Sequence, residues 1–224
     1  MLVPPSLPDP ERPSTLWPTA WWRAVYAQGW FPMADPDSGA LGLHRSLRRG
    51  VLPLDHRFHL PRSLRRVRRQ EDWQQSWRLA LNHHFEAVLD DCAARPATWI
   101  SPELKQIYRQ LHADGLVHSV EVHDGEGLAA GMLAIAIGAC WIGESMAHRR
   151  PQAGNVLLVT LVEALQSGGF LLFDVQLSNP HLARFGCLEI DDSTYRRALR
   201  LAVGQPASLR LQDGALASEA WMPQ

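Results

Sequence analysis

Lysine is nearly missing from this chain of 224 residues, which contains one lysine, Lys105, beside 21 arginines. Nine of these arginines lie between His44 and Arg69, where Asp55 is the only acidic residue. That window therefore carries about +8, and the rest of the chain about −9, although the formal net charge is −1. The near-neutral total hides a strongly dipolar sequence.

Cysteines and long apolar runs are also scarce. The three cysteines, Cys92, Cys140 and Cys187, are far apart and odd in number, which argues against a disulfide framework and a zinc knuckle. The longest uncharged run, Gly127 to Gly143, contains several glycines and is too short for a typical membrane span. The start of the chain, MLVPPSLPDPERP, has neither the charged nor the apolar segment of an export signal. We therefore expect a cytoplasmic protein that does not contact a membrane.

Several catalytic motifs are absent. The chain has no Gly-x-Ser-x-Gly sequence of serine hydrolases and no phosphate-binding P-loop. His83 and His84 are adjacent, and on a helix two neighbouring side chains point about 100° apart, so they would not share one metal ion easily. We expect neither a metal site nor a cofactor.

The first part of the chain, residues 1–62, reads as a small irregular domain. Six prolines in residues 1–20 predict an extended arm. A short helix is expected over Trp21 to Gln28, ended by Gly29, and a strand over His56 to Leu60.

The second part, residues 63–224, alternates helices and strands more regularly. An apolar stripe predicts a helix over Glu71 to Ala94. Ser101 and Pro102 are typical of a helix start, and Gly115 of its end. The remaining expected elements are three strands (117–123, 131–137 and 139–146), a helix (155–166), a strand (170–177) and a final helix. This order predicts an α/β fold with a mixed sheet.

Four arginines recur at helical spacing after Pro61: Arg62, Arg65, Arg66 and Arg69. Guanidinium groups bind phosphate oxygens in bidentate fashion and stay charged at cellular pH, so this face is suited to a nucleic-acid backbone. The alternative is a solvated helix face, or ion pairs with the acidic remainder of the chain.

Three polar side chains interrupt apolar strands. Asp174 and Gln176 lie on the same face of one predicted strand, and Glu144 ends the apolar run that begins at Met132. A buried carboxylate is costly unless it is solvated or paired, which makes these residues candidate functional groups. Either carboxylate could hold a substrate ammonium. The alternative is a closing hydrogen bond between Asp174 and Gln176 at the strand end.

Short motifs in a fixed order resemble the bacterial leucyl/phenylalanyl-tRNA-protein transferases from about Trp21 to Tyr195. Upstream, the matching motifs are Gly29-Trp30-Phe31-Pro32-Met33 and His59-x-x-Arg62-Ser63-x-x-Arg66. Downstream, they are Thr98-Trp99-Ile100, Tyr108-x-x-Leu111-His112-x-x-Gly115-x-x-His118-Ser119-x-Glu121-Val122, Gly131-Met132, Gly143-Glu144-Ser145-Met146 and Phe173-Asp174-x-Gln176-x-x-Asn179-x-His181-x-x-x-x-Gly186.

The resemblance implies transfer of Leu, Phe or Met from aminoacyl-tRNA to the amino-terminal Arg or Lys of a protein, which marks that protein for degradation. It also implies a catalytic domain similar to the GCN5-related acetyltransferases. We expect a monomer without a cofactor. Implied catalytic residues are Glu144, Asp174 and Gln176; implied donor-pocket residues are Met132, Trp141, Met146, Leu158, Leu161 and Phe173; implied tRNA contacts are Arg62, Arg65, Arg66, Arg69 and Trp99. Asp174 is expected to attract the acceptor ammonium and help remove its proton.

The chain departs from the family at a few positions. Leu43-His44 stands where the family usually has two tryptophans, Gly154-Asn155 where it tends to have Ser-Lys, and Trp141 where it often has Phe. The alternative to an active transferase is therefore a relative of that family with altered specificity, or one that binds tRNA or peptide without turnover. A CoA-dependent acyltransferase is disfavoured, because the residues before the helix expected at 155–166 do not have the pyrophosphate-binding spacing.

Overall fold

The computed structural model describes residues 6, 13–62, 64–65, 77–94, 98–211 and 214–218. In chain order the elements are η1 (Ser14–Leu16), α1 (Thr19–Ala27), β1 (Phe31–Ala34), β2 (Leu41–His44), β3 (Arg48–Leu52), β4 (Arg78–Leu81), α4 (Phe85–Ala93), α5 (Pro102–Ala113), β5 (Val117–Asp124), β6 (Gly127–Ile137), β7 (Cys140–His148), α6 (Ala153–Ser167), β8 (Leu172–Gln176), α7 (Pro180–Ala183), β9 (Leu188–Asp191), α8 (Asp192–Val203), β10 (Ala207–Leu211) and β11 (Gly214–Ser218).

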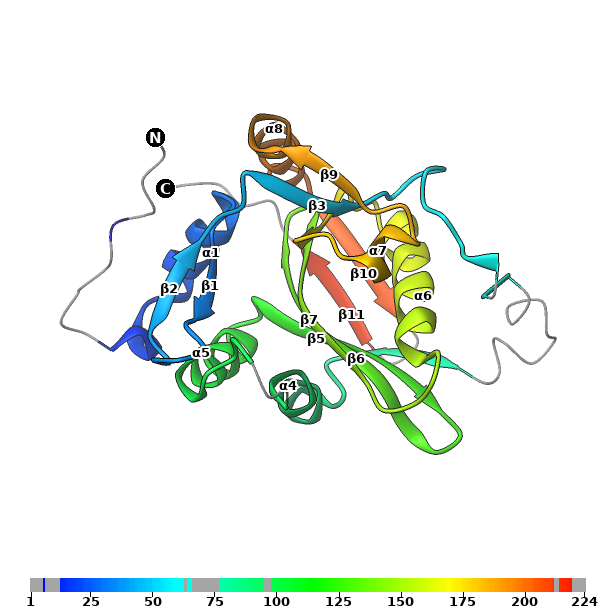
Figure 1. Ribbon diagram of the computed structural model, residues 1–224, viewed down its shortest axis with the longest axis horizontal. Coiled ribbons are helices and arrows are strands. Elements are labelled where there is room, and N and C mark those ends of the chain that lie inside the picture. The colour runs from blue at the N-terminus through cyan, green and yellow to red at the C-terminus, as the bar shows by residue number, and fades with distance from the viewer. Residues whose placement is uncertain are drawn as a thin grey trace.

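A seven-stranded mixed sheet in the order β4-β5-β6-β7-β8-β3-β9 forms the centre of the molecule (Figure 1). β7 and β8 run parallel, and the other neighbouring pairs run antiparallel. Two hairpins, β1-β2 and β10-β11, lie outside this sheet. The predicted α/β fold with a mixed sheet is confirmed. Among the described residues, no helix combines the length and apolar character needed to cross a bilayer.

Helices cover both faces of the sheet. Apolar side chains of α1, α4, α5 and α8 form one buried cluster, and those of α6 form a second cluster with the opposite face. Figure 1 shows α4 and α5 on one side of the sheet and α6 on the other. The close fit of α4 depends on Gly131 of β6, since a Cβ atom there would lie 2.3 Å from Cγ2 of Val88.

Local sequence signals explain most elements after residue 100. The Ser101 hydroxyl accepts a hydrogen bond from the backbone N–H of Leu104, and Pro102 is the first residue of α5. The helix ends before Gly115, which has a φ of +72°. The three predicted strands correspond to β5, β6 and β7, and the helix and strand expected after them correspond to α6 and β8.

β7 and β8 separate after a short contact, and this separation positions the candidate site. They pair at Cys140–Leu172, Trp141–Phe173 and Ile142–Asp174. Beyond these pairs β7 continues to His148, while β8 ends at Gln176. A gap therefore opens between β7 and β8. The residues that follow Ile142 in β7 and Asp174 in β8 face this gap.

Two predictions from the sequence are wrong. The helix expected over Glu71 to Ala94 is replaced by β4, a loop and α4, and residues 71–76 of that range lie outside the described part. The strand expected over His56 to Leu60 is a turn followed by irregular backbone. In both places tertiary pairing decides the backbone: β4 pairs with β5, and the His59 N–H donates to the carbonyl of Phe185.

The N-terminal part contributes directly to the large sheet. The predicted helix over Trp21 to Gln28 matches α1, whereas β2 and β3 were not predicted. Because β3 pairs with both β8 and β9, a catalytic domain of residues 63–224 alone would lack an internal strand. The division at residue 62 stays a prediction, and most of the predicted proline-rich arm lies outside the described residues.

Candidate active site

A cavity of about 670 Å³ opens where β7 and β8 separate. Its apolar wall includes Met132, Met146 and Leu158, and its polar lining includes Glu144. The other lining residues are Trp99, Gly143, Ser145, Ala147, His148, Gln152, Gly154, Asn155, Val175, Leu177, Asn179, His181, Leu182 and Arg184. The cavity therefore combines an apolar surface with one buried carboxylate.

Glu144 bridges the gap between the strands. Its Oε1 accepts a hydrogen bond of 2.7 Å from Nε2 of Gln176, and its Oε2 accepts one of 2.7 Å from the hydroxyl of Tyr108. Only 8% of Glu144 is exposed. The pKa of Glu144 is raised to about 7, mainly because the group is buried; the Tyr108 hydrogen bond and the charge of Arg49 oppose this rise, and the charge of Asp174 adds to it. At neutral pH this carboxyl group can both take up and release a proton.

Gln176 ends β8 in a strained conformation. Its φ is +61°, in the left-handed region that non-glycine residues rarely occupy. The N–H of Leu177 donates to the carbonyl of Val175 at 2.7 Å, which makes a γ-turn centred on Gln176. The N–H of Gln176 donates to Oδ1 of Asp174 at 2.8 Å. The turn and this hydrogen bond hold the Gln176 amide against Glu144.

Asp174 lies behind this pair and is fully buried. Its Oδ1 and Oδ2 accept hydrogen bonds from Nε (2.8 Å) and a terminal nitrogen (2.7 Å) of Arg49, and Oδ2 also accepts one from the Tyr195 hydroxyl (2.6 Å). Burial alone would lower the pKa of Arg49, but the charge of Asp174 raises it above its usual value. Asp174 is not among the residues that line the cavity. In this structure Asp174 is therefore separated from the cavity by Glu144 and Gln176, and its expected contact with an acceptor ammonium stays a prediction.

The three tyrosines of the chain are all buried around these carboxylates. Burial, followed by the charge of Glu144, raises the pKa of Tyr26 and of Tyr108 well above the usual value. Burial and Asp174 do the same for Tyr195. The contacts of these tyrosines and the pairing of Arg49 were not predicted. The family motif that begins at Tyr108 was the available signal for that residue.

The six residues expected to form a donor pocket divide into two groups. Met132, Met146 and Leu158 line the cavity. Trp141, Leu161 and Phe173 do not line it; they are fully buried in the apolar cluster that α6 forms with the sheet. The large Trp141 therefore fills the core and packs edge-on against Phe170, with ring centroids 5.8 Å apart. It does not narrow the cavity directly.

The arginines between His44 and Arg69 divide into those that form ion pairs within the protein and those that are exposed. Four of them pair with acidic residues: Arg45 with Asp192, Arg48 with Glu189, Arg49 with Asp174 and Arg57 with Asp55. Arg62 and Arg65 are exposed in a helical turn that follows Pro61, and Arg66 and Arg69 lie outside the described residues. Only part of the excess positive charge is therefore available to a phosphate backbone.

Comparison with known proteins identifies the family. The profile of the leucyl/phenylalanyl-tRNA protein transferases matches residues 51–200. This chain belongs to that family. A leucyl/phenylalanyl-tRNA–protein transferase from a Synechococcus strain is 50% identical over 181 residues, which cover 81% of this chain and 92% of the relative.

Two further relatives bear the same description. One from a Nostoc strain is 47% identical over 184 residues, covering 82% of this chain and 94% of the relative. One from Cereibacter sphaeroides is 43% identical over 199 residues, which cover 88% of this chain and 90% of the relative. The matched region of the family profile includes Glu144, Asp174 and Gln176 together with the strands that hold them. The resemblance seen in the short motifs is thus confirmed.

Proposed function

We propose that this protein transfers Leu, Phe or Met from aminoacyl-tRNA to the amino-terminal Arg or Lys of an acceptor protein. Family membership supports the aminoacyl transfer. The observation that carries the proposal is the apolar cavity wall beside a carboxyl group that titrates near neutrality. An apolar donor side chain and a cationic acceptor need these two surfaces next to each other. We place the reaction in the cytoplasm, because aminoacyl-tRNA and newly made proteins are both present in that compartment.

Met132, Met146 and Leu158 supply the apolar surface for the donor side chain. Leu, Phe and Met are all unbranched at Cβ, and the two methionines offer flexible side chains that adapt to different shapes. The shape of an apolar pocket distinguishes substrates by about 1–3 kcal/mol per methylene group. The cavity is thus suited to accept several related donors and to reject small or polar ones.

Glu144 is the proton acceptor in the proposed reaction. Its negative form attracts the acceptor's α-ammonium, and its pKa of about 7 allows it to remove a proton from the amine. The ammonium first releases one proton to solvent. The amine nitrogen then attacks the ester carbonyl while Glu144 takes a second proton from it, the bond between that carbonyl carbon and the ribose oxygen breaks, and Glu144 returns this proton to the departing oxygen. The products are an amide and free tRNA. Gln176 orients Glu144 through the 2.7 Å hydrogen bond between them.

Asp174 acts as a positioning residue in this scheme. It accepts the Gln176 N–H and so fixes the strained turn that presents the Gln176 amide to Glu144. Its own charge is balanced by Arg49 at a distance of 2.7 Å. Loss of Asp174 would therefore affect the reaction through the geometry of Gln176.

Arg62, Arg65 and Trp99 are the described residues proposed to contact tRNA. The two arginines are exposed, and Trp99 lines the cavity where the terminal nucleotide of the donor would enter. If both arginines contact phosphates, the double variant Arg62→Ala/Arg65→Ala should bind tRNA more weakly, and the slope of log K against log salt should become shallower by about 1–2. Filter binding at several salt concentrations measures this; an unchanged slope would place the tRNA elsewhere.

The proposed function is tested with charged tRNA and a peptide that begins with Arg. Mass spectrometry should detect peptides that have gained one Leu, Phe or Met residue, and a peptide that begins with Ala should gain none. Binding of charged tRNA without any mass gain would support the alternative of a relative without turnover. Transfer to the Ala peptide at the same rate would refute the proposed acceptor specificity.

A further inference from the structure

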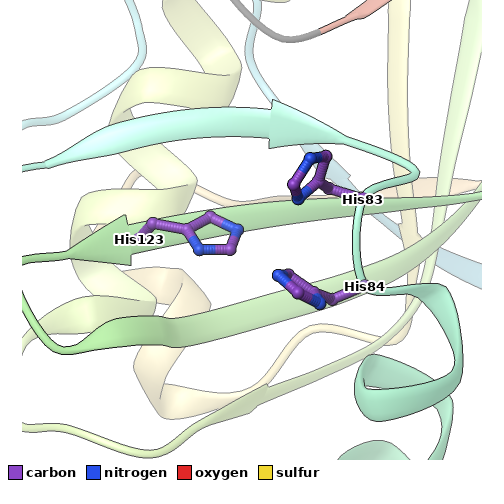
Figure 2. Close-up of side chains that lie close together, drawn as sticks. All are labelled: His83, His84 and His123. Carbon is purple, nitrogen blue, oxygen red and sulfur yellow. The ribbon is translucent and has the colours of Figure 1, made fainter.

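Three histidines from two different elements meet outside the candidate active site. His83 and His84 lie in the loop between β4 and α4, and His123 lies in β5 (Figure 2). One ring nitrogen of each lies within 4.8 Å of one ring nitrogen of the other two. None of the three lines the cavity between β7 and β8. This cluster has no role in the proposed transfer reaction.

The backbone of the loop is held firmly against β5. The Asn82 N–H donates to the carbonyl of Ser119 at 2.8 Å, and the Asn82 side-chain oxygen accepts the Ser119 N–H at 3.0 Å. The carboxylate of Glu121 accepts the backbone N–H groups of His83 (3.4 Å) and His84 (3.1 Å). Since Glu121 is two residues from His123 on one face of the strand, the contacts that fix the loop also fix its register relative to His123.

The three imidazole rings converge on one small volume. Their ring centroids are 5.0 Å apart for His83 and His84, 5.1 Å for His84 and His123, and 6.1 Å for His83 and His123. Figure 2 shows the rings gathered between the loop and the strand. In a tetrahedral zinc site, bonds of about 2.0–2.1 Å place the ligand nitrogens roughly 3.3 Å from each other. Small side-chain rotations of the exposed His83 and His84 would close the remaining distance.

We propose that His83, His84 and His123 form a binding site for Zn²⁺. Neutral imidazole is a preferred ligand of this ion, and three imidazoles leave a fourth position for water. His123 is only 7% exposed and supplies the rigid side of the site, whereas His83 and His84 are exposed and admit the ion from solvent. Arg78 lies opposite His123 in the β4–β5 register but is exposed, so water screens its charge.

The sequence led to the opposite expectation for a specific reason. His83 and His84 were placed within a predicted helix over Glu71 to Ala94, where adjacent side chains diverge. In the structure the loop precedes α4, and both rings turn toward β5 (Figure 2). His123 is 39 residues beyond His84, at no spacing that a short metal motif would show.

Isothermal titration of the full-length, untagged, chelator-treated protein with ZnCl₂ tests the site. We expect saturable binding of one Zn²⁺ per chain. The variants His83→Ala and His84→Ala should each weaken binding at least 10-fold, because each removes one of three ligands at an exposed position that the fold tolerates. His56→Ala is the matched control: it removes an exposed histidine outside the cluster and should leave the affinity unchanged.

Cobalt provides a second, independent readout. Co²⁺ bound in a four-coordinate site gives intense visible absorption, which should appear with the wild-type protein and with His56→Ala and be lost in His123→Ala. Far-ultraviolet circular dichroism of His123→Ala checks that this variant is folded. The absence of saturable Zn²⁺ binding, or equal binding by wild type, His83→Ala and His84→Ala, would overturn the proposal. The outcome does not depend on whether the protein transfers amino acids.

Discussion

Replacement of Glu144 by Gln tests the proposed proton acceptor. Glutamine has nearly the same shape; its amide oxygen can accept from the Tyr108 hydroxyl and its amide nitrogen can donate to the oxygen of a flipped Gln176 side chain, but it cannot take up a proton. In the folded chain the Glu144 pKa is about 7, against an ordinary value of 4.5. Between these two values the folded protein holds a proton that the unfolded chain has released. The free energy of unfolding contributed by Glu144 therefore falls as pH rises through this window, by an amount on the order of 3 kcal/mol.

Urea denaturation of wild type and Glu144→Gln between pH 4 and pH 8 isolates this contribution. All other titrating groups are shared, so the difference between the two free energies of unfolding reports Glu144. We expect wild type to lose stability relative to the variant across the window. A difference that stays constant with pH would refute the proposed environment of Glu144.

The same variant separates the catalytic role from the structural one. The rate of single-turnover transfer depends on two titrating groups. One is Glu144, and the other is the acceptor's α-amine, which has a pKa of about 7.7–8.0. The variant retains only the amine titration, so the ratio of the wild-type rate to the variant rate follows Glu144. We expect the ratio of the two rates to reach about 10²–10⁴ above pH 7 and to become smaller as the pH is lowered below 7. A ratio near one at every pH would show that Glu144 accepts no proton.

Three single variants and one double variant probe the surrounding structure. Asp174→Ala should lower the free energy of unfolding by about 3–5 kcal/mol, since it leaves Arg49 buried and unpaired; adding Arg49→Met should recover part of this loss, and urea denaturation measures both. Met146→Ala enlarges the cavity wall and should change the relative kcat/KM for Leu and Phe donors by about 10-fold or more, as measured with the two charged tRNAs. Gly50→Ala should cost about 1–3 kcal/mol, because its Cβ would lie 2.7 Å from the backbone nitrogen of Ser178; an unchanged denaturation midpoint would contradict this.

Elements with strong local signals were predictable from the sequence. The start of α5 is marked by a side-chain cap and a proline, and its end by a glycine with positive φ. β5 contains three β-branched valines and leads into the turn before Gly127, and α6 is an apolar run that ends at two glycines. In these segments the backbone follows preferences contained within a few residues.

Elements that depend on distant partners were not predictable. β3 begins with two arginines, and Arg49 becomes acceptable in a buried strand only because Asp174, 125 residues further on, neutralises it. β4 lies in a stretch with helical periodicity but forms a strand because it pairs with β5. The sequence showed that a buried Asp174 needs a partner, yet it could not show which of 21 arginines is that partner.

The candidate site was partly predictable. Glu144, Asp174 and Gln176 could be named from the motifs, but their different positions follow from the separation of β7 and β8. That separation exposes Glu144 to the cavity and leaves Asp174 behind it. Likewise, Trp141 and Phe173 precede the point of separation and are buried, whereas Met146 follows it and lines the cavity.

In the proposed reaction this chain joins an amino acid from tRNA to a protein amino terminus. The most direct measurement is the mass of an Arg-starting peptide after incubation with Leu-tRNA and either the wild-type protein or Glu144→Gln. We predict a gain of one Leu residue at the peptide's amino terminus with wild type. Above pH 7 the variant should transfer Leu at a rate about 10²–10⁴-fold lower. A wild-type protein that binds Leu-tRNA yet leaves the peptide mass unchanged would contradict the account.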